Sequence, residues 1–188
     1  TVCHHAGRWV LACRDGNLRA EDVVVQAHSG PIWALASGPT GLASGGRDGN
    51  ISVRPDVDAP PRLLFGAHAG GVQALAWGAP GLASGGSEGG VHLWNPSTGG
   101  RRWSWAPHRG AVAALVFAGE VLLSAGWDHT LALCPFGASA RTLPVQHRGP
   151  VTALVADGGL ALSGDATGEV LLWALPEGRV VTRWRLPD

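Results

Sequence analysis

Short runs of apolar residues recur along the chain at a regular distance, each bordered by glycine or proline. Four of them share an Ala-Leu step: IWALA, VQALA, VAALV and VTALV. Short continuous apolar runs between turn signals are typical of strands that are covered on both faces. We therefore predict four equivalent strands, at about 31–36, 71–77, 111–117 and 150–155.

Three further runs follow each of these strands and complete a repeated pattern. The second run reads GLASGG at 41–46 and again at 81–86, and the tight turn after it reads RDGN or SEGG. Asp-Gly and Gly-Gly steps supply the positive φ that two-residue hairpin turns require. A third run (NISVR, VHLWN) and a fourth (RLLFG, RRWSW, VVTRW) come next. Four short antiparallel strands per unit, covered on both faces, describe a blade packed between other blades.

Four further positions keep the same register in every unit. The histidines that begin the units are 40, 40 and 39 residues apart: His28, His68, His108 and His147. A serine follows each histidine after 16 residues: Ser44, Ser84, Ser124 and Ser163. Four residues beyond each serine stand Asp48, Glu88, Asp128 and Thr167, and ten beyond stand Arg54, Trp94, Cys134 and Trp173. A fixed period of this kind is the signature of repeat architectures. We predict an all-β propeller of four-stranded antiparallel blades, with units at 1–27 (partial), 28–66, 67–107, 108–146 and 147–188.

These residues resemble the WD-repeat β-propeller family. The family's unit combines a Gly-His pair, a Ser or Thr in the second strand, an Asp in the following turn, and Trp-Asp at the end of the third strand. The best match is the unit at 67–107, through His68, Ser84, Glu88 and Trp94. The chain departs from the pattern in that Ala, Pro or Gln precedes each histidine and no Trp-Asp closes a third strand. The resemblance implies a non-catalytic scaffold that binds a partner protein or peptide on the top face of the propeller.

The resemblance also implies a hydrogen-bonded tetrad in each unit, formed by the loop histidine, the strand serine, the turn acid and the third-strand tryptophan. Such a buried network holds a blade together because the loss of one member leaves the others unsatisfied. The expected tetrad residues are His28, Ser44 and Asp48; His68, Ser84, Glu88 and Trp94; His108, Ser124 and Asp128; and His147, Ser163, Thr167 and Trp173.

Three chemical alternatives to this structural interpretation are a metal site, a catalytic triad and a phosphate-binding loop. The four repeated histidines lie in different blades, so they cannot meet on one ion at bond lengths of about 2 Å. A Ser-His-Asp triad uses the same residue types, but the serine would lie within a strand with no oxyanion hole evident. A phosphate-binding loop would lead from the glycines into a helix and use a lysine, and the chain has no lysine. We therefore expect no catalytic, cofactor-binding or metal-binding residues.

Composition narrows the class of partner. Fourteen basic and fourteen acidic residues balance, so the positive charge expected of a nucleic-acid-binding protein is missing. No run approaches the roughly 18 apolar residues of a membrane span, and the three cysteines have no CxxC spacing. Every basic residue is arginine, and Ala, Gly and Pro are abundant, as in the proteins of GC-rich genomes. We expect a cytoplasmic bacterial protein without a membrane or nucleic-acid partner.

Because no methionine is present and Thr1 aligns with the inside of a first strand, we also expect further blades and a larger ring.

Two positions vary within the otherwise strict repeat, and the resemblance places both on the top face, where partners dock. One lies in the first strand and carries Trp33, Gln73 and Thr152; the other precedes the turn acid and carries Arg14, Arg47, Ser87 and Trp127. Trp and Arg are enriched at binding hot spots, and the planar guanidinium of arginine pairs with carboxylates through two hydrogen bonds. We predict that these seven residues bind a partner, with an acidic or phosphorylated peptide expected near Arg14, Trp33 and Arg47. The alternative is that these side chains are merely solvated or locally packed.

Two other functions stay open at this point. Propellers also host enzymes, although the first strands, which would line the central channel, carry no ionisable residue. The chain could also be the sensor part of a longer signalling protein whose catalytic domain lies elsewhere. Both rest on analogy between folds, and the full reading frame would discriminate between them.

Overall fold

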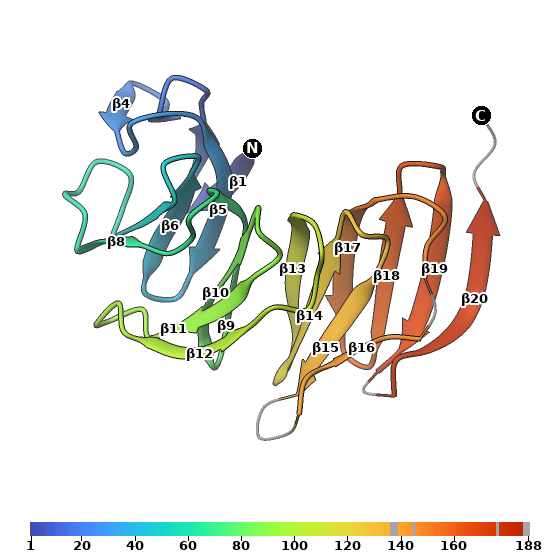
Figure 1. The fold of residues 1–188 in the computed structure, drawn as a ribbon. Helices are drawn as coiled ribbons and strands as arrows, with labels where there is room; N and C mark the ends of the chain where they lie inside the picture. Colours follow the sequence, from blue (N-terminus) through green and yellow to red (C-terminus); the bar gives the residue numbers. More distant parts are fainter. Residues whose placement is uncertain (136–138, 145, 176, 186–188) are drawn as a thin grey trace.

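The computed structural model describes residues 1–135, 139–144, 146–175 and 177–185 of the 188-residue chain. These residues form twenty β-strands arranged as five four-stranded antiparallel sheets (Figure 1). The described part contains no helix that is long and apolar enough to cross a membrane. The prediction of an all-β fold built from four-stranded blades is confirmed.

Each sheet is a meander whose strands pair in chain order. The first sheet comprises β1 (Val2–His5), β2 (Arg8–Ala12), β3 (Asn17–Ala20) and β4 (Val23–Gln26). The second comprises β5 (Ile32–Gly38), β6 (Gly41–Gly46), β7 (Asn50–Arg54) and β8 (Leu63–Gly66). The third comprises β9 (Val72–Gly78), β10 (Gly81–Gly86), β11 (Val91–Trp94) and β12 (Arg101–Trp105). The fourth comprises β13 (Val112–Ala118), β14 (Val121–Gly126), β15 (Leu131–Pro135) and β16 (Arg141–Thr142). The fifth comprises β17 (Val151–Asp157), β18 (Leu160–Asp165), β19 (Glu169–Ala174) and β20 (Arg179–Arg185).

The segment 1–27, expected as a partial unit, folds into a four-stranded sheet of its own. Its first strand, β1, has four residues, whereas the corresponding strands β5, β9, β13 and β17 have seven. The strand nevertheless pairs with β2 in regular antiparallel register, from Val2 opposite Leu11 to His5 opposite Arg8.

The turn between the second and third strands of every sheet uses one residue with positive φ. Glycine fills this position in four sheets, as Gly16, Gly49, Gly89 and Gly168, with φ between 79° and 88°. In the fourth sheet His129 adopts the same conformation, with φ of 71°. A Cβ atom on Gly49 would also lie 2.1 Å from the carbonyl oxygen of His68. The Asp-Gly step of the sequence is therefore required by both backbone conformation and space.

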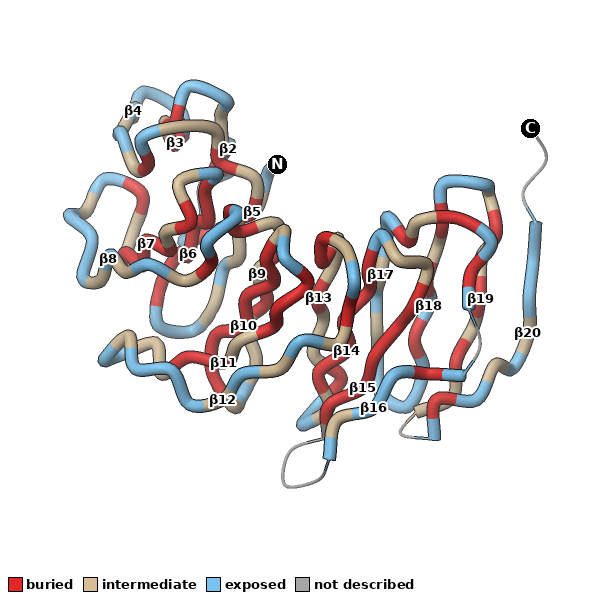
Figure 2. The backbone as a smooth tube through the Cα atoms, viewed as in Figure 1, coloured by how far each residue is buried: buried red, intermediate tan, exposed pale blue. Residues whose placement is uncertain are grey.

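The sheets pack face to face, and a hydrophobic cluster fills each of the four interfaces. Their innermost strands β1, β5, β9, β13 and β17 contact one another in that order, so the sheets follow one another across the view from blue to red (Figure 1). The interface between the second and third sheets, for example, is filled by Ile51, Val53, Val72, Leu82 and Trp94. The second strands β6 and β10 are buried at every position, whereas β20 is mostly exposed (Figure 2). Continuous burial explains why GLASGG shows no alternation of apolar and polar residues.

Candidate functional site

The third sheet contains a complete tetrad of hydrogen-bonded side chains. The Nε2 atom of His68 lies 2.8 Å from Ser84 Oγ, and the indole Nε1 of Trp94 donates to the same oxygen at 2.8 Å. The other ring nitrogen of His68, Nδ1, bonds to a carboxylate oxygen of Glu88. The loop before β9, the strand β10, the β10–β11 turn and the strand β11 each contribute one member. The network therefore ties the loop before β9 to β10, to the β10–β11 turn and to β11.

The second and fourth sheets contain the same network without its tryptophan. His28 bonds to Ser44 at 2.9 Å and to Asp48 at 3.0 Å, and His108 bonds to Ser124 at 2.8 Å and to Asp128 at 3.1 Å. The tryptophan position holds Arg54 in the second sheet and Cys134 in the fourth, and both residues are buried. The Arg54 guanidinium donates to the backbone oxygens of Ala59 and Gln26.

The fifth sheet departs from the expectation at Thr167. His147 bonds to Ser163 at 2.6 Å, and Trp173 donates to the same hydroxyl oxygen at 2.8 Å. The hydroxyl of Thr167, however, donates to Asp165 Oδ1 at 2.8 Å and forms no hydrogen bond with the histidine. The carboxylate of Asp165, two residues before Thr167, lies 3.5 Å from His147 Nδ1 instead.

Glycine makes room for the histidine in three of the four repeated units. A Cβ atom added to Gly46, Gly86 or Gly126 would lie 2.6, 2.3 or 2.5 Å from the Nδ1 atom of the histidine in its own unit. The equivalent residue of the fifth unit is Asp165. The last unit is therefore the one in which a charged side chain occupies this position.

Burial and hydrogen bonding shift the pKa values of two tetrad residues, His108 and Asp48. Burial lowers the pKa of His108, and this effect outweighs the opposing influence of Asp128. Burial opposes the ionisation of Asp48, yet hydrogen bonds from the backbone of Asn50, the ring of His28 and the backbone of Ser29 together lower the pKa of its carboxyl group. A histidine bonded to a serine and a carboxylate has the composition of a catalytic triad. The Ser84 residue is 0% exposed, however, so no substrate can approach its hydroxyl.

The two variable positions of the repeat come together at one edge of the second, third, fourth and fifth units. The backbone N–H of the residue before the turn acid donates to a carbonyl near the start of the first strand in four units. These bonds join Arg47 to Pro31, Ser87 to Gly71, Trp127 to Ala111 and Ala166 to Pro150, at 2.8–3.1 Å. The turn and the start of the first strand are therefore held side by side, on the same edge, from unit to unit.

Three of the seven predicted partner-binding residues line one cleft. Arg14, Trp33 and Arg47 surround a depression of about 460 Å³, together with Thr1, Ala12, Pro31 and Ile32. Both arginines are exposed, and in the part of the chain that the structure describes neither guanidinium forms a hydrogen bond or an ion pair. The indole of Trp33 packs against Gly71, where a Cβ atom would lie 2.5 Å from Trp33 Cζ3. The cleft thus combines a fixed aromatic wall with two free guanidinium groups.

The other four predicted residues lie outside this cleft. Gln73 donates to Ser87 Oγ at 3.0 Å, so these two side chains are bonded to each other. Trp127 is 57% exposed, and Thr152 donates to the Gly164 carbonyl at 3.4 Å. Of the seven predicted residues, Arg14 and Arg47 are the two arginines, and both line the cleft.

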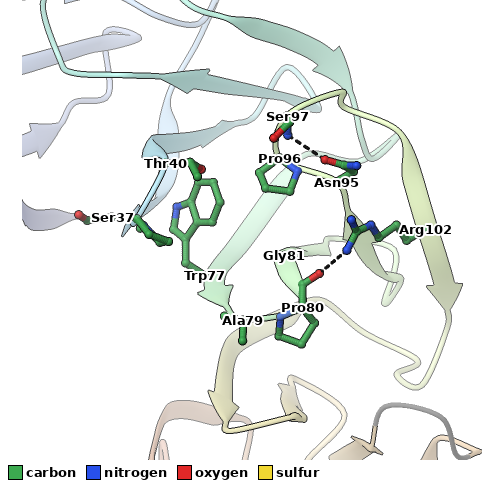
Figure 3. A pocket seen from close by; sticks show the side chains of 13 residues that line it. Ser37, Thr40, Trp77, Ala79, Pro80, Gly81, Asn95, Pro96, Ser97 and Arg102 are labelled. Carbon is green, nitrogen blue, oxygen red and sulfur yellow. Dashed lines mark hydrogen bonds between the residues drawn. The ribbon is translucent and has the colours of Figure 1, made fainter.

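A second cleft, of about 500 Å³, was not predicted from the sequence. Trp77 forms one wall, and Pro80, Asn95, Pro96 and Arg102 are among the other lining residues (Figure 3). The guanidinium of Arg102 donates to the Pro80 carbonyl at 2.8 Å, and the Trp77 indole donates to the Ala36 carbonyl at 3.0 Å. The signal in the sequence was Trp77 itself, since the equivalent positions carry Ser37, Phe117 and Ala156.

Comparison with known proteins agrees with this architecture. Residues 22–53 match the family model described as "WD domain, G-beta repeat". No curated protein sequence matches the chain. The structure superposes on the WD40 repeats of RRP9 with a TM-score of 0.85 at 23% identity, covering 95% of this chain and 60% of that one. The fold is that of the WD40 β-propellers.

Two further solved structures, of a designed and a natural protein, also superpose on this chain. The computationally designed Ika8 protein gives a TM-score of 0.87 at 22% identity, covering 97% of this chain and 60% of that one. The WD40 β-propeller domain of Doa1 gives 0.81 at 21% identity, covering 96% and 66%. The chain thus spans about three fifths of the length of the first of these structures. WD40 propellers in general are non-catalytic scaffolds that mediate protein–protein interaction.

Proposed function

We propose that this WD40 propeller is a non-catalytic scaffold that binds an acidic or phosphorylated peptide segment of a partner protein in the cleft of Arg14, Trp33 and Arg47. The observation that carries the proposal is the pairing of two unpartnered guanidinium groups with a fixed indole in one cleft. Guanidinium groups bind carboxylates and phosphates through two parallel hydrogen bonds. The indole offers apolar area at a small entropic cost.

The position of the cleft supports the same conclusion. It lies where the first and second units adjoin, so its residues come from strands and turns held by the blade cores and not from a long loop. Arg47 directly precedes Asp48, which is hydrogen-bonded to His28. The tetrad therefore fixes the turn that carries Arg47, and such preorganisation lowers the entropic cost of binding.

The second cleft supports an anionic ligand less well. Arg102 is the only ionisable residue that lines it, and one of its terminal nitrogens already donates to a backbone carbonyl. A ligand carboxylate there would compete with an existing hydrogen bond. The free donors of the first cleft would instead gain a partner.

The proposal is tested by selecting peptides from a displayed random library against the purified protein. We expect the selected sequences to be enriched in Asp and Glu, and we expect phosphorylated versions to bind at least as well. A triple variant, Arg14→Ala, Trp33→Ala and Arg47→Ala, should lose this binding while it keeps the β-sheet circular dichroism of the wild-type protein.

The matched control removes the same residue types elsewhere. Arg179, Trp184 and Arg185 are exposed on β20, at the far end of the chain from the cleft. Replacing all three with alanine should leave peptide binding unchanged. Selected peptides that bind the first triple variant as tightly as the wild-type protein would rule out the cleft.

A further inference from the structure

The fifth unit holds two buried carboxylates against one histidine. Asp165 and Glu169 have side chains that are 0% and 3% exposed. The Nδ1 atom of His147 lies 3.5 Å from Asp165 Oδ2 and 3.5 Å from Glu169 Oε2. In the other repeated units, glycine stands at the position of Asp165. The position of Glu169 is held there by Asn50, Gly90 or Thr130. This concentration of negative charge is therefore specific to the fifth unit.

The Nδ1 atom of His147 faces these two acids and is unsatisfied. Its Nε2 bonds to Ser163 at 2.6 Å, whereas the buried Nδ1 has no hydrogen-bond partner among the described residues. In the second, third and fourth units the equivalent Nδ1 is hydrogen-bonded to the turn acid. A buried polar atom without a partner is costly and requires a physical reason.

We infer that His147 Nδ1, Asp165 and Glu169 form a binding site for one divalent transition-metal ion of the zinc class. In tetrahedral coordination with bonds of about 2.0–2.2 Å, two ligand atoms lie about 3.3–3.5 Å apart. The two distances from His147 Nδ1 match this spacing, and the three ligand atoms all lie within 4.8 Å of one another. One neutral imidazole and two carboxylates balance the charge of a divalent ion. A mixed nitrogen and oxygen set favours zinc over calcium or magnesium, which prefer oxygen alone.

Surrounding hydrogen bonds orient both carboxylates toward the histidine. Asp165 Oδ1 accepts from the backbone N–H and hydroxyl of Thr167 and from the Glu169 N–H, at 2.8–3.0 Å. Its other oxygen, Oδ2, accepts from Gly149 N–H at 2.9 Å and faces His147. Glu169 Oε1 lies 3.4 Å from nitrogen atoms of Arg148 and Arg183. Its Oε2 accepts from the Arg148 backbone N–H at 3.3 Å and lies 3.5 Å from the ring nitrogen. Such outer partners fix ligand geometry in metal sites.

A second group of similar composition does not carry the same inference. His68, Glu88 and His92 also lie within reach of a common point. Both ring nitrogens of His68 are already bonded, to Glu88 and Ser84, and His92 Nδ1 is bonded to Ser104. The tetrad of the third unit therefore accounts for that group without an ion.

The test is a titration of the chelator-stripped protein with zinc chloride, followed by calorimetry and by nitrogen-15 NMR of the histidine rings. We expect one zinc ion to shift the Nδ1 resonance of His147 and to raise the melting temperature. Glu169→Gln should weaken zinc binding by at least about 100-fold. The loss of a residue that only hydrogen-bonds to a metal ligand already lowers metal affinity about 10–100-fold.

A transplanted variant keeps the test decisive if a single substitution disturbs folding. Asp165→Gly, Thr167→Asp and Glu169→Asn together give the fifth unit the residues of the second, which folds with its own histidine bonded to Asp48. This variant should remain folded and lose the zinc-dependent shift of His147. The control Asp128→Asn, in the fourth unit, should keep it. No shift of His147 Nδ1 at about 1 mM zinc, or an unchanged shift in the transplanted variant, would overturn the inference.

Discussion

The indole Nε1 of Trp94 donates to the hydroxyl oxygen of Ser84 at 2.8 Å, across two paired strands of the third sheet. Ser84 is 0% exposed and also bonds to His68, so two ring side chains share one buried hydroxyl. The hydroxyl is the centre of the tetrad, and the two ring residues are fixed relative to each other through it.

Replacing Trp94 with phenylalanine should lower the free energy of unfolding by about 1–2 kcal/mol, because an indole hydrogen bond to a buried oxygen is lost. His68→Ala should cost about 1–3 kcal/mol, since it removes the histidine bond of Glu88 and leaves the buried Ser84 hydroxyl with only its bond from Trp94. Urea denaturation followed by circular dichroism measures both changes. A His68→Ala protein with an unchanged midpoint would show that the tetrad does not stabilise the unit.

Gly85→Ala should destabilise the protein by about 1–3 kcal/mol through overpacking. The added Cβ would lie 2.5 Å from Val112 Cγ1, in the interface between the third and fourth sheets. Gly30→Ala is the matched control, because nothing lies within 4 Å of a Cβ at that position. Thermal melts of the two variants should separate clearly. Equal melting temperatures would contradict the packing of β10 against β13.

Stability should fall as the pH drops from about 6.5 toward 4, with a contribution from His92. Burial, together with the nearby charges of His68 and Arg101, lowers the pKa of His92 to about 4, against the opposing influence of Glu88. The unfolded chain binds a proton to this ring at about pH 6.5, so it takes up more protons than the folded chain in this interval. The stability contribution is therefore fully present above pH 6.5 and is lost as the pH falls.

His92→Gln should remove part of this pH dependence, about 1 kcal/mol between pH 6.5 and 4, because the ring is partly exposed and screened by water. Urea midpoints of both proteins at pH 7, 6, 5 and 4 measure the difference. Parallel curves for the two proteins over this interval would contradict the assignment to His92.

The sequence predicted the sheets because the same residues recur at the same distances. The four first strands at 32–38, 72–78, 112–118 and 151–157 lie within about two residues of the expected ranges. Their apolar runs are fixed by burial between sheets, and their ends by turns that need glycine or a positive φ. Both signals are local, and so they can be read from one sequence.

The parts that were missed depend on contacts between distant residues. Asp165 was not singled out, because its role follows from its distance to His147 and not from a repeated position. His5 links β1 to the second unit through Ser37 and the Pro55 carbonyl, although it belongs to no repeat. The cleft at Trp77 arises from loops of two adjacent sheets. A repeat pattern describes what the units share, whereas these features belong to single units.

The central claim, that the cleft of Arg14, Trp33 and Arg47 binds an anionic peptide, is tested most directly by calorimetry. An acidic peptide selected on the wild-type protein is titrated into that protein and into an Arg14→Gln/Arg47→Gln variant, which loses both charges but keeps Trp33. We predict that the variant binds at least about 30-fold more weakly, as expected when hot-spot side chains worth about 2 kcal/mol are removed. Equal affinity of the two proteins for the peptide would contradict this prediction.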